Sequence, residues 1–189
     1  DPEVLRRIVN NGNPWAIAHA HESIKCNRDI TMLALQREGK VLEFLPESFR
    51  RDRSIVCHAA KHNTAALGFA DKSVLRDREL FQYLVHYDGL AMKYALAELK
   101  SDREIMMIAV GQNGMALEYA SEELKDDKDI VLKAVCNEGW ALHHASDRLK
   151  SDRDVVLAAV AKAVSALQFA STTMQAQISN DREVALSAV

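Results

Sequence analysis

The chain is built from one short pattern of residues, written seven times and begun an eighth. Aligned on an opening Asp or Asn, these repeats 1 to 8 begin at residues 1, 27, 52, 77, 102, 127, 152 and 181, so that most are 25 residues long. A fixed period of this length is typical of proteins in which like supersecondary elements stack, each contacting only its neighbours. We therefore expect residues 1–189 to form a single solenoid.

Each repeat is expected to open with an α-helix over positions 2 to 12, counted from its opening residue. Positions 4, 5, 8 and 9 are mostly apolar, as in Ile105, Ala109 and Val110, and lie on one helical face. Asp or Asn at position 1 is a favourable N-cap, and Pro2 suits a first helical turn. A register one residue earlier, with Ser101 as the cap, is also compatible with the sequence.

The first helix is expected to end at a glycine in the left-handed conformation, which glycine adopts at no steric cost. These glycines are Gly12, Gly39, Gly89, Gly114 and Gly139. Thr64 and Val164 replace glycine in repeats 3 and 7, which predicts a different turn geometry there.

A second helix should follow, with apolar residues at positions 16 and 19 and mostly aromatic residues at position 18. Repeat 1 has one extra residue before this helix, which is left out of the count of its later positions, so that Ile17 is at position 16. It should end near position 20, where a polar or helix-breaking residue is common, and one further turn carries an apolar residue at position 23. The prediction is an all-α solenoid of about seven and a half short helix-turn-helix repeats, some with an extra 3-10 turn. Residues 171–180 carry a four-residue insertion, where a kink or a change of packing is expected.

A resemblance to a known family is carried by repeats that end in Leu-Lys-Ser-Asp-Arg-Glu and by the motif Asn-Gly-x-Ala-Leu-Glu-Tyr-Ala-Ser at residues 113–121. These features resemble the repeats of the family of domains of unknown function numbered 4116. The resemblance covers essentially the whole chain and implies an all-helical repeat, but it brings no known activity or catalytic residues with it. A more distant similarity, over residues 1–9 and 13–14, is to leucine-rich-variant repeats, which alternate α and 3-10 helices.

Composition excludes several classes of partner. The net charge is −3, and basic residues alternate with acids instead of clustering, so neither nucleic acid nor an anionic membrane is an expected partner. No apolar run approaches the ~18 residues of a membrane span. Three scattered cysteines, Cys26, Cys57 and Cys136, predict no disulfide framework and favour the cytoplasm or another reducing compartment. Without an initiator Met, and with its end inside a repeat, the sequence is expected to be a segment of a longer protein.

A basic residue occupies position 2 of repeats 2 to 8. Because acids flank it at positions 1 and 3, we expect these residues to bridge one repeat to the next; an anion track is the alternative. The set is Arg28, Arg53, Arg78, Arg103, Lys128, Arg153 and Arg182.

Catalytic and metal-binding chemistry is not expected. His58, His62 and His86 could be drawn as a zinc site, but Cys57 lies on a different helical face, and coincidental histidines are the favoured interpretation. Nucleophile-elbow, phosphate-binding and dinucleotide-binding motifs are missing from the sequence. We expect no enzyme activity, no cofactor and no metal.

One feature indicates binding of another protein or peptide. Positions 6, 7 and 10 of the first helix, which should face solvent, hold a mixture of apolar, aromatic and charged residues. Packing between layers would bury this outer row; alternatively it lines a partner groove. Its candidate partner-binding residues are Met32, Leu33, Gln36, Lys61, Tyr83, His86, Met107, Ile108 and Lys133. The predicted role is a protein-interaction scaffold, with a structural spacer, or a regulatory arm on a catalytic domain outside this segment, as alternatives.

Overall fold

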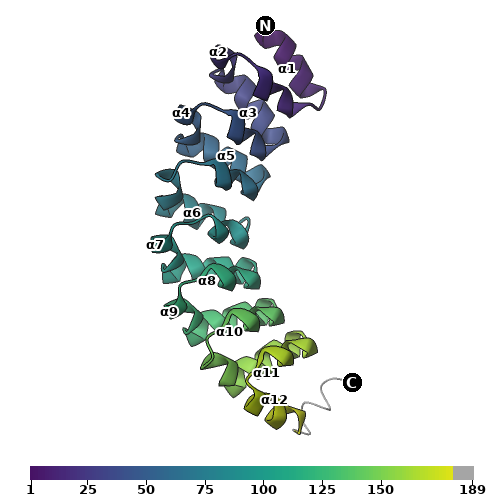
Figure 1. Ribbon diagram of the computed structural model, residues 1–189, viewed down its shortest axis with the longest axis vertical. Coiled ribbons are helices and arrows are strands. Elements are labelled where there is room, and N and C mark those ends of the chain that lie inside the picture. The colour runs from purple at the N-terminus through teal and green to yellow at the C-terminus, as the bar shows by residue number, and fades with distance from the viewer. Residues whose placement is uncertain (181–189) are drawn as a thin grey trace. The chain divides into compact units, whose positions relative to one another are not determined.

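The computed structural model describes residues 1–180, which fold into helices and turns without a β-strand in that range (Figure 1). The predicted all-α fold is therefore confirmed. The described residues divide into two compact units, a first unit of residues 1–87 with 94–96 and a second unit of residues 88–93 with 97–180. Whether all repeats form one solenoid remains a prediction.

Each complete repeat contains a ten-residue α-helix or a slightly shorter one, then a 3-10 helix, then a short α or 3-10 helix. The first unit contains α1 (Pro2–Asn10), η1 (Pro14–His19), α2 (Glu22–Lys25), α3 (Arg28–Arg37), η2 (Gly39–Phe44), α4 (Glu47–Arg50), α5 (Arg53–His62), η3 (Thr64–Phe69), η4 (Val74–Arg76) and α6 (Arg78–Leu84).

The second unit repeats the same order of elements. It contains η5 (Gly89–Lys93), α7 (Ala97–Lys100), α8 (Arg103–Gln112), η6 (Gly114–Tyr119), α9 (Glu122–Lys125), α10 (Lys128–Asn137), η7 (Gly139–His144), η8 (Leu149–Ser151), α11 (Arg153–Lys162), η9 (Val164–Phe169) and α12 (Thr172–Ser179).

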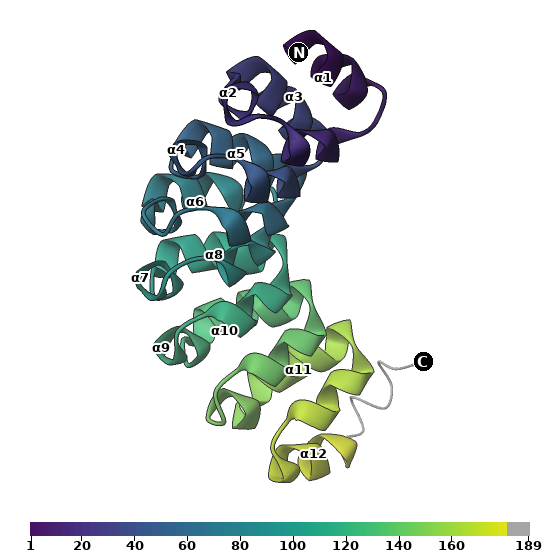
Figure 2. The same cartoon turned by 45° about the horizontal axis from the view of Figure 1, so that its top comes forward.

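The long helices of successive repeats pack side by side within each unit. In the first unit α1, α3, α5 and α6 follow one another in this way, and in the second α8, α10 and α11 do (Figures 1 and 2). In repeats 2 to 7 the residues at positions 4, 5, 8 and 9 of these helices are at most 6% exposed, as predicted. Burial of this shared apolar face stabilises helices that would be marginal alone.

The predicted N-caps are confirmed for repeats 1 to 7. The side chains of Asn27 and Asp102, for example, accept hydrogen bonds from the backbone N–H groups two and three residues ahead. The register with the opening residue as cap is thus the one adopted, and Ser101 is not the cap of α8. Pro2 lies at the first position of α1, as expected.

The second helix of the repeat is a 3-10 helix of five or six residues, which the sequence did not distinguish from an α-helix. In η6 the N–H of Ala120 donates to the carbonyl of Leu117, three residues back, and η1, η2, η3, η7 and η9 end in the same way. A 3-10 helix has three residues per turn, so the apolar residues at positions 16 and 19 lie on one face of a 3-10 helix as they would on one face of an α-helix.

The predicted role of the glycines is correct only for Gly12, whose φ is 96°. In repeats 2, 5 and 6 the last residue of the long helix is followed by an extended one, such as Asn113 (φ −147°, ψ 112°), and glycine begins the 3-10 helix. A Cβ atom at Gly39, Gly89, Gly114 or Gly139 would lie 2.3–2.5 Å from the position-8 carbonyl oxygen of the next repeat. Glycine is therefore needed for close approach between repeats.

The prediction of a different turn in repeats 3 and 7 is wrong. Asn63 and Ala163, which precede Thr64 and Val164, are extended like their counterparts elsewhere. The irregularity near repeat 3 lies instead in the long helix of repeat 4. This helix, α6, ends at Leu84 and has seven residues instead of ten.

The four-residue insertion lengthens the last helix of repeat 7. This element has three or four residues in repeats 1 to 6, whereas α12 has eight and is capped by the hydroxyl of Ser171. The kink that we predicted between repeats 7 and 8, like repeat 8 and Arg182, concerns residues outside the described range.

Candidate functional site

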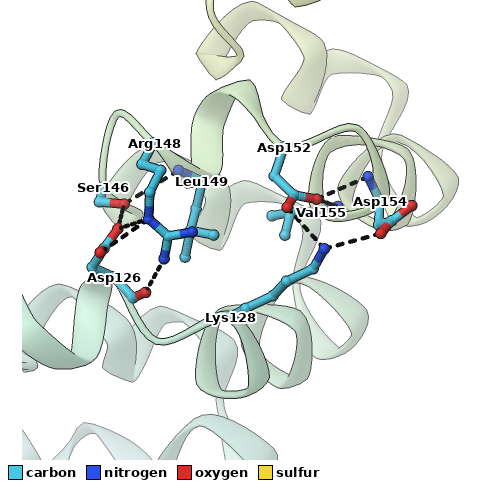
Figure 3. Close-up of polar contacts among 8 residues, drawn as sticks. All are labelled: Asp126, Lys128, Ser146, Arg148, Leu149, Asp152, Asp154 and Val155. Atoms are coloured by element: carbon cyan, nitrogen blue, oxygen red, sulfur yellow. Dashed lines mark hydrogen bonds and ion pairs between the residues drawn. The ribbon is translucent and has the colours of Figure 1, made fainter.

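At four repeat junctions of the described range, the basic residue at position 2 bridges to the next repeat, as predicted. The Nζ atom of Lys128 lies 2.8 Å from Asp152 Oδ2 and 2.9 Å from Asp154 Oδ2, at positions 1 and 3 of repeat 7 (Figure 3). Arg103 contacts Asp127 and Asp129 in the same way, at 2.8 Å each. Four acids at position 1, namely Asp52, Asp77, Asp127 and Asp152, therefore cap their own helix and also bind the preceding repeat.

The first unit contains the same contacts. Arg28 lies 2.9 Å from Asp52, and Arg53 lies 3.2 Å from Asp77 and 3.0 Å from Glu79. At these four junctions the cations are paired with carboxylates, which favours the bridging interpretation over an anion track. Hydrogen bonding to Lys128 lowers the pKa of Asp152, and the same contact raises the pKa of Lys128.

A second polar contact joins repeats 5 and 6. Arg148 donates from Nε to both carboxylate oxygens of Asp126, at 3.0 and 3.1 Å, and from Nη2 to its backbone carbonyl at 2.6 Å (Figure 3). Ser146 also contacts this carboxylate, and its hydroxyl accepts from the backbone N–H of Leu149. The residues along this edge thus serve the packing of repeats.

The three histidines considered for zinc are held in different contacts. The rings of His58 and His62 meet edge to face, with centroids 4.9 Å apart, while Nδ1 of His86 lies 2.7 Å from the backbone oxygen of Gln82. Burial lowers the pKa of His58 and raises that of the Cys57 thiol. Among residues 1–180, no three His, Cys, Asp or Glu side chains are grouped so as to hold a metal ion.

The predicted outer row divides into half-buried and exposed residues. Met32, Leu33, Met107 and Ile108 are half-buried, which agrees partly with the packing interpretation. Gln36, Lys61, Tyr83, His86 and Lys133 are exposed. Met107 and Ile108 line a shallow hollow of about 460 Å³ in the second unit, together with Arg103 and Glu104.

Two residues of the predicted row, Lys61 and Tyr83, form a cluster with Tyr87, which the prediction did not include. The Nζ atom of Lys61 lies 5.4 Å from the ring centroid of Tyr83 and 5.0 Å from that of Tyr87. The Tyr87 hydroxyl donates to the Tyr83 hydroxyl at 3.0 Å, and their ring centroids are 5.0 Å apart. We call these three residues the Lys-Tyr cluster.

The Lys-Tyr cluster is open to solvent and electrostatically linked. The side chains of Tyr83 and Tyr87 are 41% and 53% exposed, and Lys61 is exposed too. Hydrogen bonding between Lys61 and Tyr83 raises the pKa of the ammonium and lowers that of the phenol. The pKa of Tyr87 is raised, chiefly by its hydrogen bond to Tyr83. Tyr87 follows Tyr83 by four residues, and this spacing was the signal that could have added Tyr87 to the predicted row.

A second exposed aromatic surface lies on the 3-10 helices and was not predicted. Trp140, 43% exposed, stacks edge to face on Phe169 with centroids 5.5 Å apart, and His143 lies 4.8 Å from the same ring. Trp15 and Phe44 make the equivalent contact in the first unit, at 6.0 Å. Tryptophan at position 14 in two repeats was the available signal.

Comparison with known proteins identifies a family but no characterised relative. The sequence model of the Domain of unknown function (DUF4116) matches residues 1–50, 32–76, 77–125 and 127–175. No curated protein and no solved structure matches the chain. None of the helices in the described part of the chain has the length and hydrophobicity needed to cross a bilayer.

Proposed function

We propose that this chain, which belongs to the DUF4116 family of domains of unknown function, is a helical repeat module that binds another protein. The observation that carries the proposal is the Lys-Tyr cluster, where two tyrosines and an ammonium group are held together at the surface. Tyrosine is enriched at the energetic centres of protein interfaces, since it combines a large apolar ring with a polar end.

The chemistry of the cluster favours a particular kind of partner. Lys61 and the Tyr83 hydroxyl supply hydrogen-bond donors, and the two rings supply apolar area. A peptide segment with a carboxylate or free backbone carbonyls next to an apolar side chain would use both. The contacts between the three side chains hold them in place before binding, which lowers the entropy cost of association.

We propose further that the segment has no catalytic activity of its own. The sequence lacks the nucleotide-binding and hydrolase motifs, and the charged residues at four repeat junctions are paired in structural contacts. Cys26, Cys57 and Cys136 are free thiols, which suits a reducing compartment.

The experiment compares partner capture by the intact chain and by a variant with Tyr83→Glu and Tyr87→Glu. Both side chains are exposed, so the substitutions should leave circular dichroism and thermal unfolding nearly unchanged. The control is Gln36→Glu, an exposed change in the same predicted row of the first unit. We expect a captured protein to bind the intact chain and the control equally, and the double variant at least about tenfold more weakly, as loss of a central tyrosine predicts.

Two outcomes would contradict the proposal. If every captured protein binds the double variant as well as the intact chain, the cluster is not the binding surface. If nothing is captured and substitutions in the outer row change only stability, the chain is a structural spacer. A regulatory arm would instead be shown by altered activity of an attached catalytic domain.

A further inference from the structure

The outer face of α1 exposes residues that are buried in every other described repeat. Val4 and Ile8 are 53% and 38% exposed, whereas positions 4 and 8 of repeats 2 to 7 are at most 2% exposed. The two side chains line a hollow of about 620 Å³ together with Asp1, Ala16 and Ile24. We call this surface the α1 face; α1 is the outermost helix of the first unit in Figures 1 and 2.

The other repeats show what covers this surface. In each unit the 3-10 helix of one repeat packs against the long helix of the next, as η2 does against α5 and η7 against α11. Positions 4 and 8 of the later helix are buried there. The α1 face thus has the apolar half of an interface that the chain forms repeatedly.

The charged half of that interface is also present. At four junctions a basic residue at position 2 of the covering repeat reaches the acid at position 1 of the covered repeat, and at three of them also the acid at position 3. Repeat 1 has Asp1 and Glu3 at these positions, and Asp1 caps α1 just as Asp152 caps α11. A covering repeat with Arg or Lys at position 2 would therefore find both carboxylates in place.

A backbone contact completes the pattern. The N–H at position 20 donates to the carbonyl at position 24 of the preceding repeat, as in Ser121 to Lys100 and Ser146 to Lys125, at 3.0 Å each. His21 occupies position 20 of repeat 1 and lines the hollow. Apolar, ionic and backbone features of the α1 face thus all correspond to one type of occupant.

We propose that the α1 face binds one further repeat of the same pattern, which covers Val4 and Ile8 and pairs its basic residue with Asp1 and Glu3. Repeat 3 is the best template for this occupant. It packs through α5 against α6, whose position-8 residue is Leu84, a large side chain like Ile8; the other covered repeats have alanine there.

The test joins a second copy of residues 52–76 directly before Asp1 of the full chain, which reproduces the junction between repeats 3 and 4. We expect amide exchange in α1 to slow by at least about tenfold and thermal unfolding to occur at a higher temperature, since a covered helix opens less often. The same extended chain with Val4→Asp and Ile8→Asp is the control. These residues are exposed in the chain without the extension, so the changes should abolish the gain without unfolding repeat 1.

A second control separates ionic from apolar contributions. Changing the basic residue at position 2 of the added copy, the counterpart of Arg53, to Glu should reduce the slowing and its dependence on salt. Unchanged α1 exchange in the extended chain would overturn the proposal. A second result would also overturn it: sedimentation could show that the original chain forms dimers and that these are lost with Val4→Asp and Ile8→Asp. The α1 face would then bind a second copy of the chain. The Lys-Tyr cluster is intact in all these chains, so neither result bears on the proposed partner binding.

Discussion

The hydroxyl group of Thr31 donates a hydrogen bond to the backbone carbonyl of Lys25 in the preceding repeat, at 3.0 Å. Thr31 is fully buried at position 5 of repeat 2, and repeats 3 to 7 all have an apolar residue at this position. The Lys25 carbonyl lies at position 24, which elsewhere accepts from the N–H at position 20 of the next repeat. Repeat 2 has Pro46 at position 20, and proline has no N–H. The buried hydroxyl replaces the missing donor.

Because the Thr31 hydroxyl takes the place of the N–H that Pro46 lacks, the effect of Thr31→Val can be predicted. The variant keeps the shape of the side chain but leaves the Lys25 carbonyl without this donor, so unfolding in urea should show a loss of about 1–3 kcal/mol. Thr31→Ser is the control that keeps the hydroxyl. Adding Pro46→Ser restores an N–H at position 20 and should recover part of the loss in a double-mutant cycle. If Thr31→Val lowers stability by the same amount in the original chain and in the Pro46→Ser variant, this account is refuted.

The close approach of Gly114 to Ala134 predicts a large effect of adding one methyl group. A Cβ atom at Gly114 would lie 2.4 Å from the carbonyl oxygen of Ala134, so Gly114→Ala should destabilise the chain by about 1–3 kcal/mol or more. Gly111→Ala, inside α8, is the matched control. Its Cβ would meet only the flexible end of Lys133 at 3.1 Å, so a gain of about 0.5–1 kcal/mol is expected from helix propensity. Thermal unfolding of the two variants should therefore shift in opposite directions.

The N-cap of α3 can be tested without disturbing an ion pair. Asn27 accepts from the N–H groups of Asp29 and Ile30, at 3.1 and 3.2 Å. Asn27→Ala removes this acceptor and should cost about 1 kcal/mol in urea unfolding. Asn27→Asp keeps a capping oxygen and should be neutral. A stability of Asn27→Ala equal to that of the original chain would show that another group caps the helix.

The junction carboxylates predict acid sensitivity. The pKa of Asp152 is lowered by its bond to Lys128, and that of Asp71 is lowered to about 2, chiefly by Ser73. A lowered folded-state pKa stabilises the fold above the unfolded value of about 3.9, and this contribution is lost as the pH falls through the folded pKa. Stability should therefore fall between about pH 4 and 2.

The variant Asp152→Asn tests the sign of this effect. Asparagine still caps α11 but cannot form the ion pair, so stability should be lower at pH 7 and should change less between about pH 4 and 2. The measurement is urea unfolding at a series of pH values. Asp147→Asn, an exposed change in the preceding repeat, is the control and should follow the original profile. A profile of Asp152→Asn as steep as that of the control would contradict the prediction.

Much of the fold could be predicted because the signals repeat. The apolar positions, the N-caps such as Asp102 and the cations such as Lys128 recur at fixed intervals, so each is supported several times over. The type of the second helix could not be predicted, since residues spaced by three suit both α and 3-10 helices. Glycine was ambiguous too: it serves a left-handed turn at Gly12 and close packing at Gly114, and the residue type is the same for both.

The candidate site was less accessible to prediction. Lys61 and Tyr83 were placed in one row because positions 10 and 7 of the first helix both belong to its outer face, and they do lie together. The degree of exposure was not predictable, because short helices bury more than one face: Met32 is half-buried whereas Tyr83 is not. The exposure of Trp140 was unexpected because it depends on the tighter turn of η7.

The contacts between glycine and the position-8 carbonyl join the same two positions at each junction where they occur, which bears on how such genes change length. Duplication or loss of 25 codons creates a new boundary between residues already suited to each other. An insertion of another size would shift every downstream side chain out of register, unless it lies where the chain tolerates a longer element, as in α12. Members of this lineage should accordingly differ by whole multiples of the period, with irregular additions confined to the last helix of a repeat.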